Sequence, residues 1–546
     1  MDNGRHLDQL LTEAVSDYPE GKIKTVDGSG KGEKESNYTE TSFSQLGEQV
    51  ARLGAAFKER GLGQGDKIAI IGKPHPRWAA VFFAIQRIGA IAVPVAADIT
   101  SQEIRRILQE SEATFLAVEP ESQGMVQRVI DLLPQLEDVL VYKGDPEEGF
   151  LSWDSFLTAS QLEGPRSDSP ANLAAIMYTS GTTGDAKGVT LSHRNLTINA
   201  FDIDHLLDLS PEDNAASILP WYHIYGLTVS LLTPLTAGVS ILYTDQYRNL
   251  SQVLKENEAT ILLAVPKLFN VLYEEVRKRI EANLFSRVLD RLAPWAIRGK
   301  VKESFAGSQL RFAVSGGAPL DPEVAKGLRR LGIGIYEGYG LTETSPVITW
   351  TPDPFTRKEG SVGQSLPHVR MKIRDGEVIV KGPTVMGGYY KNPDRTAEII
   401  DEEGWLHTGD SGQLDEDGWL YLNGRQKNVI VLPSGNNVYP EEVEWELERL
   451  PYLKEVLVKE RQRKGRPVVA ASIYPSYGAL SEEKGLEEPD EIKDFVWSQV
   501  KEGCKNLAAY KRIKSKKDLK IMQDPFEKTP TLKIKRYLYQ DEEVHN

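Results

Sequence analysis

The stretch KIAIIGKPHPRWAAVFFAIQRIGAIAVPVAADITSQEIRRILQESEATFLAV, residues 67–118, determines the fold class. Short apolar runs at 67–71, 91–96 and 114–118 are typical of buried strands, and the two segments between them have the length and periodicity of helices. Strands that alternate with helices form parallel sheets covered by crossover helices. The stretch therefore predicts an α/β fold with doubly wound sheets.

The same alternation extends on both sides of this stretch. Residues 42–61 have a helical pattern, whereas the first 40 residues are poor in pattern. Five further strand-like runs follow downstream, with helical segments between them: AAIMYTS (174–180), ASILP (216–220), VSILY (239–243), ATILLAV (259–265) and LRFAVSGG (310–317). Ligands of such sheets bind beyond the carboxyl ends of the strands. The loop at 178–189 and the segment at 315–320 are therefore candidate ligand sites.

The pattern changes after about residue 365. MKIRDGEVIVKG (371–382) consists of two short strands around an Asp-Gly dipeptide, a strong hairpin signal, and DEDGWLYLNGR (415–425) indicates a second hairpin. The chain then continues with a helix, a strand pair, a helix and a basic tail, which together form a compact α+β unit. We therefore predict a large N-terminal domain, 1–424, of doubly wound sheets with a β-rich subdomain, and a small α+β C-terminal domain, 425–546.

Composition restricts the class of protein. The chain has 546 residues, of which 40% are hydrophobic and 26% charged, as expected of an ordinary globular protein with two or more domains. Its 65 basic and 79 acidic residues give a net charge of -14, which argues against a nucleic-acid partner. The single cysteine, Cys504, excludes an intrachain disulfide and a cysteine-cluster metal site. It fits a reducing compartment, so we expect a cytoplasmic protein.

YTSGTTGDAKGV (178–189) gathers hydroxyl side chains and glycines around one lysine, Lys187. The P-loop pattern of nucleotide triphosphatases fails here twice, because Ala186 stands at its second glycine and Gly188 at its magnesium-binding hydroxyl residue. Glycine N–H groups, hydroxyls and a lysine are nevertheless suited to phosphate. A phosphate site and a solvated surface loop both stay open on composition alone.

Two further motifs carry polar groups. In YEGYGLTET (336–344), Tyr339 is suited to stack on a base, Thr342 to hydrogen-bond a phosphate and Glu343 to ligate magnesium. The alternative is a strand-end turn with a capping Thr and Glu. GWLHTGD (404–410) ends in Asp410, whose carboxylate suits two ribose hydroxyls, although an Asp that caps a turn is common.

These stretches, in this order and spacing, resemble the adenylate-forming superfamily, which includes acyl-CoA synthetases, adenylation domains and beetle luciferases. The resemblance covers roughly residues 40–537, nearly the whole chain. It implies an enzyme that activates a carboxylic acid with ATP and magnesium, and a C-terminal domain that is mobile.

The resemblance also implies roles for single residues. The loop at 178–189 resembles the family's phosphate loop, in which Ala186 replaces the usual proline, and LPWYHIYG (219–226) resembles the aromatic gate motif that places His223 beside the acyl carboxylate. A structural core histidine is the alternative for His223. The residues expected around ATP are Thr179, Ser180, Gly181, Thr182, Thr183, Gly184 and Lys187 at the outer phosphates, Gly317, Ala318 and Pro319 at adenine and the acyl group, Glu337, Gly338 and Tyr339 at adenine, Thr342 at the α-phosphate, Asp410 at the ribose and Arg425 at the ribose or a phosphate. Glu343 is the expected magnesium ligand, Lys427 the hinge of the mobile domain, and Gly435 part of the loop offered to pantetheine.

The last motif departs from the family pattern. EKTPTLKIKR (527–536) aligns Lys533 with the catalytic lysine, but Leu532 replaces a glycine and Glu527 a proline. Long-chain acyl-CoA synthetases often lack that glycine, and the segment at 284–305 lies where that group carries extra sequence. We therefore expect a medium- or long-chain fatty acid as substrate, with an aryl acid as the alternative.

By the same resemblance, Lys533, Lys187, Glu343, Thr342 and His223 act in the formation of acyl-AMP, and the acyl group then passes to coenzyme A. Delivery to a carrier protein and a non-catalytic nucleotide-binding remnant stay open as alternatives. The expected partners are a fatty acid and coenzyme A, and peripheral membrane contact and a homodimer are left open. The basic segment at 510–522 is interpreted as a solvated charged face rather than a site for the phosphates of coenzyme A or an anionic membrane.

Overall fold

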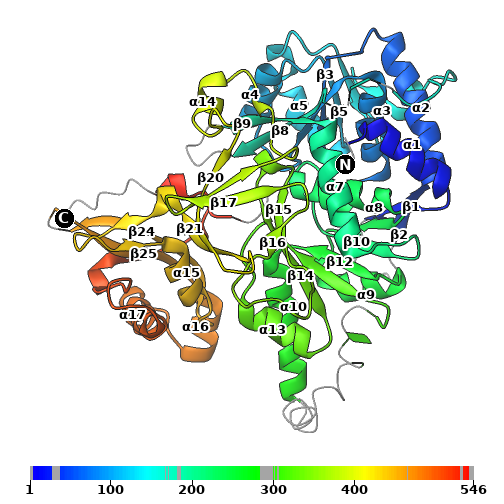
Figure 1. Cartoon of the computed structure of the whole chain (residues 1–546). Helices are drawn as coiled ribbons and strands as arrows, with labels where there is room; N and C mark the ends of the chain where they lie inside the picture. The colour runs from blue at the N-terminus through cyan, green and yellow to red at the C-terminus, as the bar shows by residue number, and fades with distance from the viewer. Residues whose placement is uncertain are drawn as a thin grey trace.

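The computed structural model describes residues 4–27, 37–166, 168–169, 171–180, 186–282, 299, 302–303, 307–463, 465–528 and 533–539. Figure 1 shows a large body and, beside it, a smaller lobe in orange and red that is formed by the C-terminal part of the chain. Most of the segment expected at 284–305 lies outside the described residues, as do Gly181, Thr182, Thr183, Gly184 and Leu532.

Two large sheets form the body. The first has nine strands in the described residues, in the order β16-β15-β14-β13-β12-β10-β11-β1-β2, and the second has eight, in the order β19-β9-β8-β4-β3-β5-β6-β7. In the first sheet the bounds are β1 (Lys22–Asp27), β2 (Asn37–Ser42), β10 (Asn214–Ser217), β11 (Ser240–Tyr243), β12 (Ile261–Ala264), β13 (Phe312–Ser315), β14 (Gly334–Gly340), β15 (Val347–Trp350) and β16 (Gln364–Ser365). In the second they are β3 (Lys67–Ile71), β4 (Ile91–Val95), β5 (Phe115–Val118), β6 (Asp138–Val141), β7 (Leu151–Ser152), β8 (Leu173–Ser180), β9 (Ala186–Ser192) and β19 (Gly388–Tyr389). The inner pairs of both sheets are parallel and the antiparallel pairs lie at the edges, which confirms the predicted α/β class.

Helices cover the sheets, and one of them forms the centre of the core. The helices of the body are α1 (Leu7–Asp17), α2 (Phe43–Glu59), α3 (Pro76–Ile88), α4 (Ser101–Ser111), α5 (Gln123–Gln127), α6 (Trp153–Phe156), α7 (His193–Leu207), α8 (Thr233–Thr236), α9 (Leu250–Glu256), α10 (Pro266–Ala282), α13 (Pro322–Arg330) and α14 (Pro393–Ala397). Helix α3 is apolar almost all round and buries Trp78, Phe82 and Phe83 completely, as expected of a helix enclosed on every side. The ring of Trp78 lies 5.5 Å from that of Trp221, so the core reaches the 219–226 motif.

The β-rich subdomain is a four-stranded antiparallel sheet, β17 (Arg370–Arg374), β18 (Glu377–Lys381), β20 (Leu406–Leu414) and β21 (Leu420–Arg425). Both hairpins predicted from the sequence are present. At the first turn, Asp375 and Gly376 have φ values of 51° and 79°, the left-handed pair that an Asp-Gly dipeptide adopts readily.

The C-terminal lobe has an apolar core of its own, built from residues between Ile430 and Leu519. It contains β22 (Ile430–Val431), β23 (Asn437–Val438), β24 (Leu453–Arg463), β25 (Arg466–Pro475), β26 (Leu519–Ile521), α15 (Pro440–Glu448), α16 (Tyr477–Lys484) and α17 (Pro489–Gly503). Cys504 is buried in this core. The division after residue 424 stays a prediction.

Two regions differ from the expectation. The first 40 residues, which seemed poor in pattern, contain α1 and contribute β1 and β2 to the first sheet, because His6 caps α1 and Leu7, Leu10 and Leu11 pack into the main core. The segment expected as a loop at 178–189 is strand up to Ser180 and again from Ala186, since β8 and β9 pair as a hairpin. In this pairing, Thr179 of β8 lies opposite Lys187 of β9.

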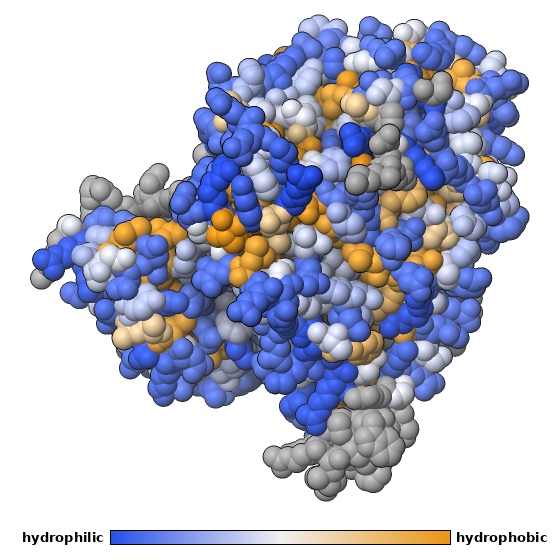
Figure 2. Space-filling model, viewed as in Figure 1, coloured by the Kyte–Doolittle hydropathy of each residue, from blue (hydrophilic) through white to orange (hydrophobic). Residues whose placement is uncertain are grey.

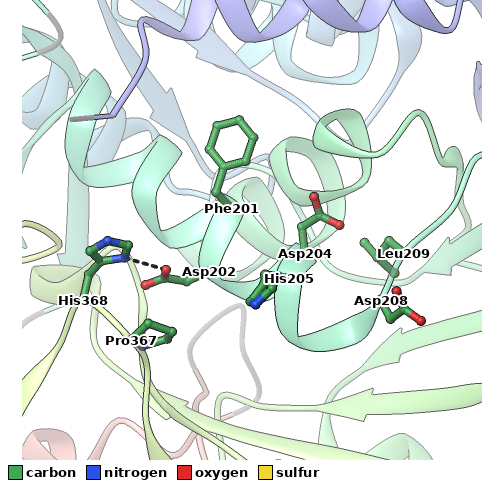
Figure 3. Close-up of a pocket in the computed structure, with 8 residues that line it drawn as sticks. All are labelled: Phe201, Asp202, Asp204, His205, Asp208, Leu209, Pro367 and His368. Atoms are coloured by element: carbon green, nitrogen blue, oxygen red, sulfur yellow. Dashed lines mark hydrogen bonds and ion pairs between the residues drawn. The ribbon is translucent and has the colours of Figure 1, made fainter. Parts of the chain in front are cut away.

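A cavity of about 480 Å³ lies at the C-terminal end of α7 and is lined by Phe201, Asp202, Asp204, His205, Asp208, Leu209, Pro367 and His368 (Figure 3). Nδ1 of His368 lies 2.6 Å from Oδ1 of Asp202, which ties α7 to the connection before β17. None of the predicted site residues lines this cavity.

The surface in the view of Figure 2 is largely hydrophilic, with scattered apolar patches. Over the described ranges, every helix is too short or too polar to cross a membrane.

Candidate active site

Asp410 is the centre of a buried polar cluster. Strand pairing places it opposite Arg425, and its carboxylate accepts a hydrogen bond from the Tyr339 hydroxyl at 2.6 Å and pairs with Arg425 Nε at 2.9 Å. Tyr339 comes from β14, so the cluster joins the first sheet to the β-rich subdomain. Asp410 is only 7% exposed, and burial raises the pKa of its carboxyl, while Arg425 and the Tyr339 hydroxyl oppose that rise. These contacts fix the orientation of the carboxylate.

Lys533 of the C-terminal lobe reaches this cluster. It interacts electrostatically with Arg425 and Asp410, and with His223 of the 219–226 motif. The side chain of Lys533 keeps an exposed surface. Burial lowers the pKa of Lys533, the charge of Arg425 lowers it further, and the charge of Asp410 opposes this shift. The C-terminal lysine and the N-terminal cluster therefore form one site.

His223 is neutral in this site at pH 7. Burial, with a smaller effect from Lys533, lowers the pKa of His223 to about 4. Its Nδ1 accepts a hydrogen bond from the backbone N–H of Tyr225 at 3.3 Å. In a neutral ring the other nitrogen then carries the proton, so Nε2 is a hydrogen-bond donor.

A second group of predicted residues gathers around Lys187. The hydroxyl of Tyr389 donates to Oε1 of Glu343 at 2.8 Å, and Nζ of Lys187 lies 5.3 Å from the centre of the Tyr389 ring. Burial lowers the pKa of Lys187, Arg395 and Lys427 lower it further, and Glu343 opposes the shift. Lys187, with Arg395 and Lys427 close enough to disfavour its charge, is suited to bind a multiply charged anion.

This group adjoins a cavity of about 860 Å³. Its lining residues are Arg106, Gln109, Glu110, Tyr178, Lys187, Gly188, Tyr389, Tyr390, Lys391, Asn392 and Arg395. The cavity is large enough for the phosphate groups of a nucleotide.

Comparison with known proteins places the chain in a family. A family model described as AMP-binding enzyme matches residues 11–390. The chain belongs to the AMP-binding enzyme family. The resemblance on which the prediction relied is thereby confirmed.

This AMP-binding enzyme is similar to acid–CoA ligases of different substrate classes. It is 28% identical over 551 residues to the long-chain-fatty-acid–CoA ligase FadD15 of Mycobacterium bovis, covering 91% of this chain and 90% of that protein. It is 30% identical over 424 residues to the sulfoacetate–CoA ligase of Cupriavidus necator, covering 75% of this chain and 77% of that protein. Its fold is similar to that of the anthranilate CoA ligase AuaEII in complex with anthranoyl-AMP, with a TM-score of 0.80, 22% identity and coverage of 98% of this chain and 97% of that one.

The other predicted residues of this AMP-binding enzyme lie in several places. Gly317, Ala318 and Pro319 are exposed after β13, and Gly317 has a φ of 83°. Gly338 faces Trp350 so closely that a Cβ there would lie 2.9 Å from the indole ring. Thr342 is half-buried at the start of a short 3₁₀ turn, Thr342–Thr344, that also carries Glu343. Lys427 is exposed in the turn after β21, and Gly435 is exposed, with a φ of 79°, at the turn between β22 and β23.

The side chain of Glu337, a predicted site residue, is engaged in an ion pair within the protein. Its carboxylate forms a buried ion pair with Arg357, and the two side chains are 8% and 2% exposed. Adenine would therefore meet the backbone of β14 at this position rather than a free carboxylate. Arg357 belongs to no sequence motif, so its ion pair with Glu337 could not be predicted from the sequence.

Sequence reasoning missed two further residues, Tyr389 and Arg395. Both lie in GGYYKNPDRT (387–396), a segment to which no role was assigned from the sequence. A tyrosine and an arginine close to a predicted phosphate lysine can be recognised only once β19 is known to pair with β9.

The residues around Glu343 fit magnesium held in part by a nucleotide. Within the described part of the chain, no group of three or more His, Cys, Asp or Glu side chains could hold a metal alone. Magnesium, however, is usually bound by one or two carboxylates together with substrate phosphates. Glu343 accepts its hydrogen bond at Oε1, and its Oε2 accepts none from the described residues.

The basic segment at 510–522 makes contacts within the lobe. Lys511 pairs with Glu442 at 2.6 Å, Lys516 forms an ion pair with Asp494, and Arg512 Nε donates to the carbonyl of Leu507 at 2.8 Å. These contacts favour the interpretation of this segment as a solvated charged face.

Proposed function

We propose that this enzyme is an AMP-forming acid–CoA ligase that activates a medium- or long-chain fatty acid. One observation carries the proposal: Lys533, from the C-terminal lobe, lies with Asp410, Arg425 and His223 of the body. Family membership and the group of cations around Lys187 support it.

In the first half-reaction the carboxylate of the acid attacks the α-phosphorus of ATP and pyrophosphate leaves. An anion approaches an anionic centre, so the site must neutralise charge where the new bond forms. Lys533 would meet the carboxylate and the α-phosphate, with Thr342 beside that phosphate. His223 would donate from Nε2 to the acid without adding a charge.

The remaining predicted residues would hold the nucleotide. Asp410 would accept hydrogen bonds from the ribose hydroxyls, with Arg425 beside it, and Lys187 would bind the outer phosphates together with Thr179 and Ser180. Magnesium bound at Glu343 would neutralise part of the phosphate charge. Arg395 adds a positive charge near Lys187 that the sequence did not suggest.

The second half-reaction transfers the acyl group to the thiol of coenzyme A and releases AMP. It needs a different arrangement of groups at the acyl carbonyl, because Lys533 would occupy the side from which the thiol approaches. We propose that the C-terminal domain rotates about Lys427, leaves Arg425 with the body, withdraws Lys533 and presents the Gly435 turn to the pantetheine arm. The exposure of both Lys427 and Gly435 leaves them accessible for such a movement.

The choice of a fatty acid is the finer part of the proposal. It draws on the similarity to a long-chain-fatty-acid–CoA ligase, while other relatives act on indoleacetate and sulfoacetate. Each methylene buried in an acyl channel contributes about 0.8 kcal/mol, so affinity should rise with chain length until the channel is full. If the substrate is an aryl acid instead, affinity should not rise with the chain length of a fatty acid in this way.

The test is AMP and pyrophosphate formation with a panel of acids, from C4 to C18 fatty acids to benzoate, indoleacetate and sulfoacetate. We expect pyrophosphate release to need ATP, magnesium and an acid, and steady-state AMP release to need coenzyme A as well, with the highest kcat/KM for a fatty acid of eight or more carbons. A preference for an aryl or sulfonated acid would refute the fatty-acid class. Turnover with a carrier protein but not with coenzyme A would refute the acceptor, and no turnover with any acid would refute the ligase itself.

A further inference from the structure

Tyr389 touches both the expected magnesium ligand and the expected phosphate lysine. Its hydroxyl donates to Oε1 of Glu343 at 2.8 Å, and the centre of its ring lies 5.3 Å from Nζ of Lys187. The tyrosine is only 9% exposed. One rigid side chain therefore bridges two groups that lie far apart in the sequence.

Strand pairing sets the contact with the lysine. Strand β19 pairs with β9 in antiparallel register, and Tyr389 lies opposite Val189. Lys187 precedes Val189 by two residues and so points to the same face of β9, where it is the diagonal neighbour of Tyr389. The backbone N–H of Tyr390 donates to the carbonyl of Gly188 at 2.7 Å and fixes this register.

Two hydrogen bonds tie the other partner to the same segment. The backbone N–H of Met386 donates to the carbonyl of Glu343 at 2.9 Å, and the hydroxyl of Ser345 donates to the carbonyl of Thr384 at 2.8 Å. Glu343 is thus held through its backbone and its side chain by residues just before and at β19. A shift of β19 would move Glu343 and Lys187 together.

The chemistry of the tyrosine suits a fixed donor. A phenol is protonated near neutral pH, and the Tyr389 hydroxyl directs its proton to Oε1 of Glu343. A phenol that holds Oε1 stops the carboxylate from rotating and leaves Oε2 facing away from the hydrogen bond. The electron-rich face of the ring attracts the ammonium group of Lys187 without neutralising its charge.

We propose that Tyr389 is a positioning residue, which orients Oε2 of Glu343 toward magnesium and holds Nζ of Lys187 toward the outer phosphates of ATP. The inference rests on the proposed function, because it adds a residue to the same site. Nothing in the motifs of the sequence assigns this role to Tyr389.

Two variants separate the hydroxyl from the ring. Tyr389→Phe removes the hydrogen bond to Glu343 and keeps the ring beside Lys187, whereas Tyr389→Leu removes both contacts. Tyr452→Phe is the matched control, because the Tyr452 hydroxyl also donates to a carboxylate, that of Glu483 at 2.9 Å, but belongs to the C-terminal lobe and to none of the predicted site residues.

The first readout is the magnesium concentration that gives half-maximal pyrophosphate release at saturating ATP. We expect it to rise about tenfold in Tyr389→Phe, the effect of losing one hydrogen bond to a charged group. The KM for ATP at saturating magnesium should stay within about threefold in Tyr389→Phe and rise about tenfold in Tyr389→Leu. A tyrosine that only supported the fold would lower the melting temperature without this split.

The second readout needs no turnover. Calorimetric titration with α,β-methylene ATP, which cannot release pyrophosphate, compares binding in magnesium with binding in EDTA. We expect the gain in affinity from magnesium to shrink about tenfold in Tyr389→Phe and to stay unchanged in Tyr452→Phe.

The two proposals fail in different ways. A wild-type chain that binds the analogue with magnesium but turns over no acid would refute the ligase, and the binding titration would still decide the role of Tyr389. An unchanged magnesium dependence in Tyr389→Phe, an equal change in Tyr452→Phe, or no effect of magnesium on wild-type binding would overturn the role of Tyr389.

Discussion

Replacing Lys533 by alanine should separate the two half-reactions. The ammonium group lies with Asp410, Arg425 and His223, where the carboxylate of the acid and the α-phosphate would meet. A single preorganised group that meets charge developing in a transition state contributes about 2.7–4 kcal/mol. We therefore expect adenylate formation to slow by a factor of about 100 to 1,000.

The neighbouring groups cannot take over this role. Arg425 is held by Asp410 at 2.9 Å and donates from its Nη1 to the carbonyl of Thr408 at 2.9 Å, so it is not free to move into the vacated space. The same pair leaves Asp410 compensated in the variant, so the melting temperature should change by no more than about 3 °C. The pKa of His223 should rise when the neighbouring charge is lost, yet burial, the larger cause of its shift, keeps the ring neutral at pH 7.

The assay follows each half-reaction alone. Pyrophosphate release from ATP and the acid reports adenylation, and thioester formation from a preformed acyl-adenylate and coenzyme A reports transfer. Lys535→Ala is the matched control, because Lys535 belongs to the same segment but faces Glu527 at 3.9 Å. Adenylation should fall only in Lys533→Ala, and transfer should stay within about threefold in both variants. Equal losses in the two half-reactions would refute the assignment of Lys533 and the proposed rotation.

Three further results are expected. Asp410→Asn should raise the KM for ATP by about tenfold or more, because it weakens charge-assisted hydrogen bonds to the ribose, and an unchanged KM in steady-state kinetics would contradict that role. Arg357→Met should lower the free energy of unfolding by about 3–5 kcal/mol in urea titrations, since it leaves the buried carboxylate of Glu337 unpaired; a loss below about 1 kcal/mol would show that the pair contributes little. Burial lowers the pKa of His75 to about 3, so between pH 6.5 and pH 3 the unfolded chain binds a proton that the folded chain does not. Stability should therefore fall with decreasing pH by up to about 1.4 kcal/mol per pH unit from this residue, and His75→Asn, which keeps an acceptor at the start of α3, should flatten the dependence measured by denaturation at several pH values.

Much of the fold could be predicted from local pattern. The stretch at 67–118 alternates between short apolar runs and helical segments. Each of its strands is buried on both faces, and strands buried in this way consist almost entirely of apolar residues, so they can be recognised in the sequence. The hairpin at Asp375 and Gly376 was predictable for a local reason as well, since few dipeptides adopt two left-handed residues in succession.

The parts that could not be predicted depend on distant partners. Helix α1 was overlooked although its buried apolar residues, Leu7, Leu10, Leu11 and Ala14, have helical spacing, because its N-cap is a histidine and not one of the usual capping residues. Glu337 was predicted to contact a ligand because no residue near it in the sequence indicates its ion pair with Arg357. Tyr389 and Glu343 are 46 positions apart, and only the folded chain brings them within hydrogen-bonding distance.

The contact between Trp78 and Trp221 has a consequence for efforts to change the accepted acid. Because the indole of Trp221 is completely buried and its Nε1 donates to the hydroxyl of Ser230 at 3.2 Å, the backbone that leads to His223 is anchored in closely packed core. Substitutions that change the packing of this motif should therefore cost stability. New selectivity should be sought after β13, where Ala318 and Pro319 face solvent, while Gly317 should be kept because of its φ of 83°.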